Sequence, residues 1–162
     1  MILEEKKIIS PSARVMIYIA DKEINENVVE SFKESIGLFL NNWMSHNESV
    51  DAHFEIKNNR IFVFFIDEEE VQLGGCAIDN FHRFLQQVSK DHGINLFDRF
   101  QFAYKDADGE VIFCDKDSFK TKYADKKIDD QTLVLNSLVN NLSDFQHHLF
   151  IPLGQSWHKN LV

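Results

Sequence analysis

The sequence predicts an α+β domain with a ferredoxin-like core, in which an antiparallel sheet carries two helices on one face. Segments with strand-like and helix-like hydrophobic patterns follow in the order β-α-β-β-α-β-β-α-α, and the first six match the ferredoxin-like order. A length of 162 residues, 44% of them hydrophobic, is typical of one domain with its own core. We therefore expect a single domain over 1–162. Its α+β core would span 1–116, and a helical extension would span 117–162.

The first strand and helix have clear patterns. Residues 13–20 form a β-branched, apolar run with little alternation, which predicts a strand buried on both faces. Asn25 is the expected N-cap of a helix from Glu26 to Trp43. The apolar stripe of this helix recurs every three or four residues, at Val28, Phe32, Ile36, Phe39 and Trp43.

The next two strands form a predicted hairpin. Residues 51–56 alternate between polar and apolar, and Asn58-Asn59 suits a tight turn. The strand after the turn, Ile61–Ile66, is apolar at every position, so a two-layer domain would leave one of its faces open to water. We expect the C-terminal helices to cover that second face. Coverage by a second copy of the chain is the alternative, and both can hold.

A second helix is predicted from Cys76 to His92, with Gly93 as its C-terminal stop. The remaining elements follow from turn and capping residues. They are a strand through 97–104, a turn at 106–109, an extra strand at 111–113, a helix capped by Asp117 or Ser118, an extended piece at 132–135, and a helix capped by Ser137 and broken at Pro152.

Charge and cysteine content exclude several classes of function. The net charge is −9, from 17 Lys+Arg against 26 Asp+Glu, which argues against binding of nucleic acid. No apolar run approaches the ~18 residues of a membrane span. Residues 1–10 lack the apolar segment of a signal peptide. Cys76 and Cys114 are too few and too far apart for a disulfide scaffold, so we expect a cytoplasmic protein.

The sequence also lacks the common nucleotide and metal motifs. None of its six glycines is followed by the Lys of a phosphate-binding loop. Asp51, His53 and Glu55 share one face of a predicted strand, but this pattern is more typical of a solvated edge strand than of a metal site. We therefore expect no metal and no other cofactor.

Gly74-Gly75-Cys76 is the segment best suited to chemistry. Its glycines let a ligand approach the backbone, and a helix start offers free N–H groups to an anion. A Cys in this position can be a nucleophile or a redox thiol. The structural alternative, which we favour, makes Cys76 the N-cap, with Asp79 bonding back to its N–H. The candidate ligand-binding residues are Gly74, Gly75, Trp43 and Trp157.

Two histidines are candidate bases for Cys76. His46 follows the first predicted helix, and His158 lies in the C-terminal tail. The favoured structural alternatives are a cation at a helix C-terminus for His46 and a surface residue for His158. Together the catalytic candidates are Cys76, Asp79, His46 and His158.

Several short motifs, taken as a set, resemble a small bacterial family without an established function, whose members often carry the label "ABC transporter ATPase". The chain departs from the family pattern at Ala77, where Ser is usual, and at Asn47, where Gly is usual. The label implies ATP hydrolysis, but no phosphate-binding loop is present, so we interpret the label as a naming error. The motifs that carry the resemblance are Ala13-Arg14-Val15 with Ile17-Tyr18 and Ala20-Asp21, Trp43-x-Ser45-His46, Ala52-x-Phe54-Glu55, Gly75-Cys76-x-Ile78-Asp79, Asn95-Leu96-Phe97-Asp98-Arg99, Leu138-Val139 and Ser156-Trp157-His158.

These observations favour a binding or interaction module that self-associates as a homodimer or docks another protein. The basis is an excess of apolar strand surface together with the lack of a strong catalytic motif. ATPase activity is not expected. The alternative is a thiol-dependent enzyme or redox switch that uses Cys76 with a His or Asp partner.

Overall fold

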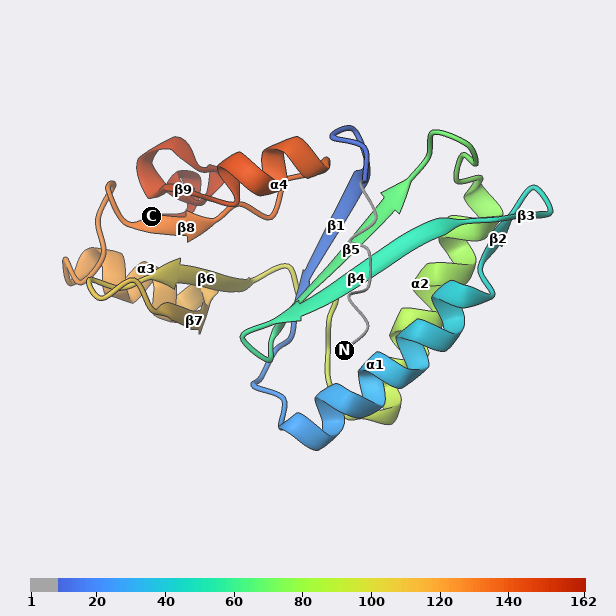
Figure 1. Cartoon of the computed structure of the whole chain (residues 1–162). Coiled ribbons are helices and arrows are strands. Elements are labelled where there is room, and N and C mark those ends of the chain that lie inside the picture. The colour runs from blue at the N-terminus through green and yellow to red at the C-terminus, as the bar shows by residue number, and fades with distance from the viewer. Residues whose placement is uncertain (1–8) are drawn as a thin grey trace, which may run out of the picture.

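The computed structural model describes residues 9–162 (Figure 1). The prediction that residues 1–10 lack a signal-peptide segment therefore lies almost wholly outside the described residues. The fold is α+β, with antiparallel sheets. Within residues 9–162 no helix has both the length and the apolar character needed to cross a bilayer.

The N-terminal half consists of a three-stranded antiparallel sheet with two helices on one face (Figure 1). Its strand order is β1-β5-β4, so β5 is central. Asn25 caps α1 as predicted, because its side chain accepts a hydrogen bond from the Val28 N–H at 3.0 Å. The elements are β1 (Arg14–Ile19), α1 (Glu26–Asn41), β4 (Asp51–Lys57), β5 (Ile61–Asp67) and α2 (Gly75–Asp91).

Both faces of β5 are covered, as its uninterrupted apolar run predicts. Phe62, Phe64 and Ile66 pack into the core beneath α1 and α2. Ile61, Val63 and Phe65 pack on the opposite face, against residues of the C-terminal half of the same chain that include Ala103, Leu135 and Val139. The chain therefore supplies its own cover, and no second copy is needed on this face.

The predicted fourth strand of the core belongs to a different sheet. β6 (Gln101–Lys105) pairs with β7 (Val111–Asp115) and β8 (Leu133–Leu135), in a four-stranded sheet whose order is β7-β6-β8-β9. The outer edge of β1 is bonded instead to the segment before α4, where the Val15 N–H donates to the Asn140 carbonyl at 3.0 Å. The ferredoxin-like topology is not confirmed, because the first sheet has three strands rather than four.

The C-terminal extension, 117–162, contains two strands as well as helices, and one of them, β8, lies in the predicted extended piece at 132–135. α3 (Lys116–Ala124) is capped by Asp115 rather than by Asp117 or Ser118. α4 (Leu142–His148) is capped by Asn141 rather than by Ser137. β9 (Phe150–Pro152) follows α4, and two short 3-10 helices, Leu153–Gln155 and Trp157–Leu161, complete the chain.

Candidate functional site

Three hydrogen bonds connect residues 43–45, which follow α1, to residues 72–77, where α2 begins. The Trp43 indole N–H donates to the Ala77 carbonyl at 3.0 Å. The Ser45 hydroxyl donates to the Gln72 carbonyl at 2.7 Å and accepts from the Gly74 N–H at 3.0 Å. Both side chains are buried, and Trp43 is 3% exposed. Residues of two of the sequence motifs, about 30 positions apart, therefore meet in space.

A tight hairpin after α1 positions this segment against the start of α2. Strands β2 (Met44–Ser45) and β3 (Glu48–Ser49) are joined by His46 and Asn47, whose φ angles are +52° and +62°. Two successive positive φ values define the turn that best fits the twist of a two-residue hairpin. Asn and Gly are the residues that adopt this conformation most readily, so Asn47 suits this turn.

The His46 ring packs against Gly74. A Cβ atom at Gly74 would lie 3.0 Å from His46 Nε2, so glycine leaves room for the ring. His46 itself is exposed, and it lies in the hairpin turn rather than at the end of α1. The structure thus brings together two of the residues that the sequence singled out, His46 and Gly74.

Cys76 and Asp79 lie on α2, but they do not cap it. The N-cap is Gly74, and the cap makes no side-chain hydrogen bond. The predicted capping interaction between Asp79 and the Cys76 N–H is therefore wrong, because the helix begins before Cys76. Cys76, in the first turn, and Asp79, in the second, are both exposed.

His158 and Trp157 lie in the short 3-10 helix that ends the chain. The C-terminus and α2 are on opposite sides of the molecule (Figure 1). His158 is 2% exposed, so the expectation of a surface residue is wrong. Its Nδ1 is 2.6 Å from the Ser156 hydroxyl, and its ring packs on Phe102 with centroids 4.7 Å apart. Burial lowers the pKa of His158 to about 4, so the ring is neutral at physiological pH. Its place in this aromatic cluster is structural.

Trp157 stacks on the His158 ring, with centroids 4.1 Å apart. Its indole nitrogen is buried and has no hydrogen-bond partner among the described residues. Trp43 and Trp157 therefore do not line the same site. Trp43 belongs to the core beneath α1 and α2, whereas Trp157 packs on the C-terminal core.

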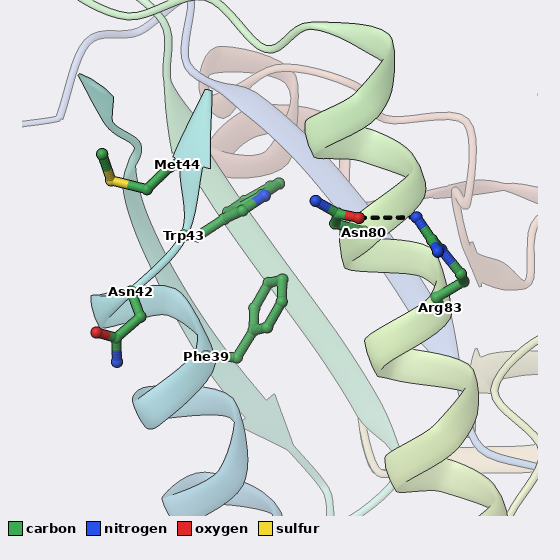
Figure 2. Close-up of a pocket in the computed structure, with 6 residues that line it drawn as sticks. All are labelled: Phe39, Asn42, Trp43, Met44, Asn80 and Arg83. Carbon is green, nitrogen blue, oxygen red and sulfur yellow. Dashed lines mark hydrogen bonds between the residues drawn. The ribbon is translucent and has the colours of Figure 1, made fainter. Parts of the chain in front are cut away.

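A hollow of about 400 Å³ lies between the end of α1 and the first turns of α2 (Figure 2). The rings of Phe39 and Trp43 point into the space between the two helices, and Asn80 and Arg83 line it from α2. We call this feature the α1–α2 groove. The residues that line it are Phe39, Asn42, Trp43, Met44, Asn80 and Arg83.

The floor of the groove is fixed by aromatic stacking, and its polar rim is ordered. Phe39 stacks on Phe84 with centroids 4.2 Å apart and planes 8° apart, and Trp43 stacks on Phe81 at 5.2 Å. The Arg83 guanidinium donates to the Asn80 side-chain oxygen at 2.8 Å. The groove is therefore preformed, with an aromatic base beside amide and guanidinium donors.

Of the residues that line the groove, only Trp43 is among the ligand-binding candidates predicted from the sequence. A signal for the others exists in the sequence, because Ser35–Asn47 contains no Asp, Glu, Lys or Arg in a chain that is 27% charged. Exposed large side chains also occur in this run: Leu38 is 68% exposed and Met44 is 46% exposed.

A second hollow, of about 430 Å³, lies at the other end of α2. Its lining includes Asp21, Ser89 and Phe97, and the side chains of Asp21 and Ser89 have partners within the fold. Asp21 accepts from the Asn95 N–H at 3.0 Å, and the Ser89 hydroxyl donates to the Leu85 carbonyl.

Among residues 9–162, no three His, Cys, Asp or Glu side chains are grouped so that they could hold a metal ion. On β4, His53 Nε2 lies 3.2 Å from an Asp51 carboxylate oxygen. No family model, curated protein or solved structure matches the chain. The resemblance to the bacterial family stays a prediction.

Proposed function

We propose that the chain is a binding and interaction module that works through the α1–α2 groove, and that it is not an ATPase. The observation that carries this proposal is the convergence of an aromatic floor, exposed apolar side chains and polar donors in one preformed hollow. Such a combination is typical of surfaces that recognise an apolar side chain together with a neighbouring polar group.

The openness of the groove favours a protein partner over a small metabolite. Small-molecule sites enclose most of the ligand surface, whereas this groove is open to solvent along one side. Met44 in the lining of the hollow, and Leu38 one helical turn before Asn42, add exposed apolar surface. A protein segment can cover this wider area, with an apolar side chain above Phe39 and an acceptor group near Arg83.

A short probe tests whether the groove binds such chemistry. We expect N-acetyl-phenylalaninate to shift the NMR signals of the Trp43 indole N–H, the Asn80 side-chain amide and the Arg83 Nε–H, with millimolar affinity. N-acetyl-glycinate, which lacks the ring, serves as the matched control. Absence of shifts at these three groups, or equal shifts with both probes, would contradict the proposed site.

A thiol-dependent enzyme or redox switch is the second candidate. One observation favours it: Cys76 is exposed one helical turn before Asn80 of the groove, and the His46 ring lies against Gly74 nearby. We expect a reactive Cys76 to be alkylated by iodoacetamide faster than a free thiol, whose pKa is about 8.5. Replacement of His46 by Asn should then slow the reaction.

The second cysteine provides an internal control for this experiment. Burial raises the pKa of Cys114 to about 11, so its alkylation at neutral pH should be slow. A Cys76 that reacts only at the rate of a free thiol, or whose rate is unchanged in the His46→Asn chain, removes the thiol hypothesis.

A further inference from the structure

We propose that the outer edge of β4 pairs with the β4 edge of a second copy of this chain. The two strands run antiparallel about a two-fold axis at Phe54, so the two three-stranded sheets join into one continuous sheet. This inference goes beyond the proposed function, because it concerns a sheet edge and not the α1–α2 groove.

The direction of the backbone groups of β4 follows from the hydrogen bonds of the sheet. β4 ends the strand order β1-β5-β4 and pairs with β5 on one side only (Figure 1). On β1, the Val15 N–H donates to the Asn140 carbonyl outside the sheet, so Phe65, opposite Val15, directs its backbone groups toward His53 of β4. Hydrogen-bonded and non-hydrogen-bonded pairs alternate along antiparallel strands. His53 and every second residue of β4 are therefore bonded to β5.

The residues between them, Ala52, Phe54 and Ile56, direct their N–H and C=O groups to the outer edge. Among residues 9–162 no backbone hydrogen bond reaches this edge. β4 is seven residues long, contains no Pro or Gly, and pairs with β5 without a break in register. Such an edge can accept another strand along its whole length.

One register satisfies the backbone bonding and uses all of β4. With Phe54 opposite Phe54 of the second copy, Ala52 lies opposite the second copy's Ile56, and the reverse pair follows by symmetry. In each of these pairs the two residues exchange both N–H···O bonds, because all of them direct their backbone groups outward. The two-fold axis then passes between the two copies of Phe54.

The charged side chains of β4 are complementary to themselves in this register. Asp51 lies opposite the second copy's Lys57, and His53 lies opposite the second copy's Glu55. These four side chains share one face of the strand and are between 34% and 53% exposed. Opposite charges directly across a strand pair are favourable, and like charges are destabilising. A shift of the two-fold register by one step would place Asp51 opposite Glu55, or His53 opposite Lys57, so the charges select the central register.

The other face of the joint is apolar. Phe54 stacks on Phe64 of β5 with ring centroids 6.3 Å apart, and Ala52 and Ile56 pack beside it at the margin of the core. All three side chains of β4 on this face are only partly buried. Pairing places Phe54 beside its own copy and Ile56 beside Ala52, so the burial of apolar surface adds to the backbone bonds.

The net charge of −9 on each chain opposes association, so the contact has to be attractive locally. At physiological ionic strength, charges separated by more than about 8 Å are largely screened. Residues directly opposite one another on paired strands have Cβ atoms only about 4.5–5.5 Å apart. Salt therefore weakens the repulsion between distant charges more than the attraction across β4. We expect the dimer to strengthen when NaCl is raised from about 10 mM to about 150 mM, whereas binding of an oppositely charged partner would weaken.

Amide hydrogen exchange tests the edge itself. The N–H groups of Ala52, Phe54 and Ile56 become bonded only in the dimer, so their exchange should slow at least about tenfold between micromolar and millimolar protein. Over the same range the mass from light scattering should rise from 18.9 kDa toward twice that value. The N–H groups of His53 and Glu55 are already bonded to β5, and their exchange should slow by a smaller factor.

A charge-exchange experiment tests the register. Lys57→Glu places a carboxylate opposite Asp51, and Asp51→Lys places an ammonium group opposite Lys57, so each variant alone should dimerise at least about tenfold more weakly. An equal mixture of the two should form a heterodimer, and the double variant should recover the homodimer. Lys120→Glu is the matched control, because it changes the net charge equally at an exposed position of α3, and its dimer should persist.

Three results would overturn the inference. They are a chain that stays monomeric at millimolar concentration, a dimer that forms without slower exchange at Ala52, Phe54 and Ile56, and a dimer that Lys57→Glu weakens no more than Lys120→Glu does. The shifts with N-acetyl-phenylalaninate are expected whether or not β4 pairs. The proposed function of the groove therefore stands or fails in a separate measurement.

Discussion

The buried His158 should make the stability of the protein depend on pH between neutral and mildly acidic conditions. The folded protein keeps the ring neutral down to a pKa of about 4, whereas the unfolded chain takes up a proton near 6.5. The contribution to stability is therefore complete above pH 6.5 and declines as the pH falls. The decline amounts to about 2 kcal/mol at pH 5 and approaches about 3 kcal/mol below pH 4.

Urea unfolding at pH 7 and pH 5 measures this loss in the wild-type chain and in a His158→Phe variant. The variant keeps an aromatic ring beside Phe102 but cannot titrate, so it should lose less unfolding free energy between pH 7 and pH 5. The difference between the losses of the two chains is the contribution of His158 alone, without that of the other ionisable groups. It should start about 1–3 kcal/mol less stable, because the buried Ser156 hydroxyl loses its hydrogen bond to the ring nitrogen of His158. Equal losses in the two chains, or a His158 NMR titration midpoint near 6.5 in the folded protein, would refute the reasoning.

Three further predictions concern the contacts that hold the layers together, each measured by chemical or thermal unfolding. Ser45→Ala should cost about 1–3 kcal/mol, because it leaves two backbone groups at the start of α2 without their partner, and Ser49→Ala is the exposed control. Arg60→Lys should cost about 1 kcal/mol, since the guanidinium donates twice to one carbonyl and lies over the Phe113 ring; a neutral result would contradict this role. Phe65→Ala should cost about 3–5 kcal/mol if the second face of β5 is a true core, and a loss below 1 kcal/mol would contradict that.

Local patterns in the sequence predicted those elements whose structure depends on local interactions. The unbroken apolar run of β5 required two covered faces. Asn25 begins α1 through a hydrogen bond of its own side chain, and Gly93 follows the end of α2 with a positive φ angle, so both signals are local. The predicted cap Ser137 was wrong because Asn141, four residues later, accepts the Asp144 N–H at 2.8 Å. Both residue types cap helices well, so capping preference alone does not choose between them.

The pairing of β6 could not be predicted from its own residues. Ala103 faces the core shared with β5, whereas Phe102 and Tyr104 face the C-terminal core, so either sheet would bury an apolar face of this strand. The choice depends on the edge of β1, which is taken by residues 140–142. These residues lie nearly 40 positions further along the chain than β6, so the hydrophobic pattern of β6 does not indicate that they occupy this edge.

The same nonlocality explains why the candidate interaction surface lies on the helix layer and not on the sheet face that the apolar run of β5 indicated. The apolar surface that predicted association belongs to β5, and the C-terminal half covers it within one chain. Association through that face would require the C-terminal half to detach, which would expose Phe65 and Val63 to water at a cost of several kcal/mol. The outer side of α1 and α2 carries no such cost, because Leu38 and Met44 are already exposed and their burial can only be favourable. A partner can therefore bind the helix layer while the chain remains folded.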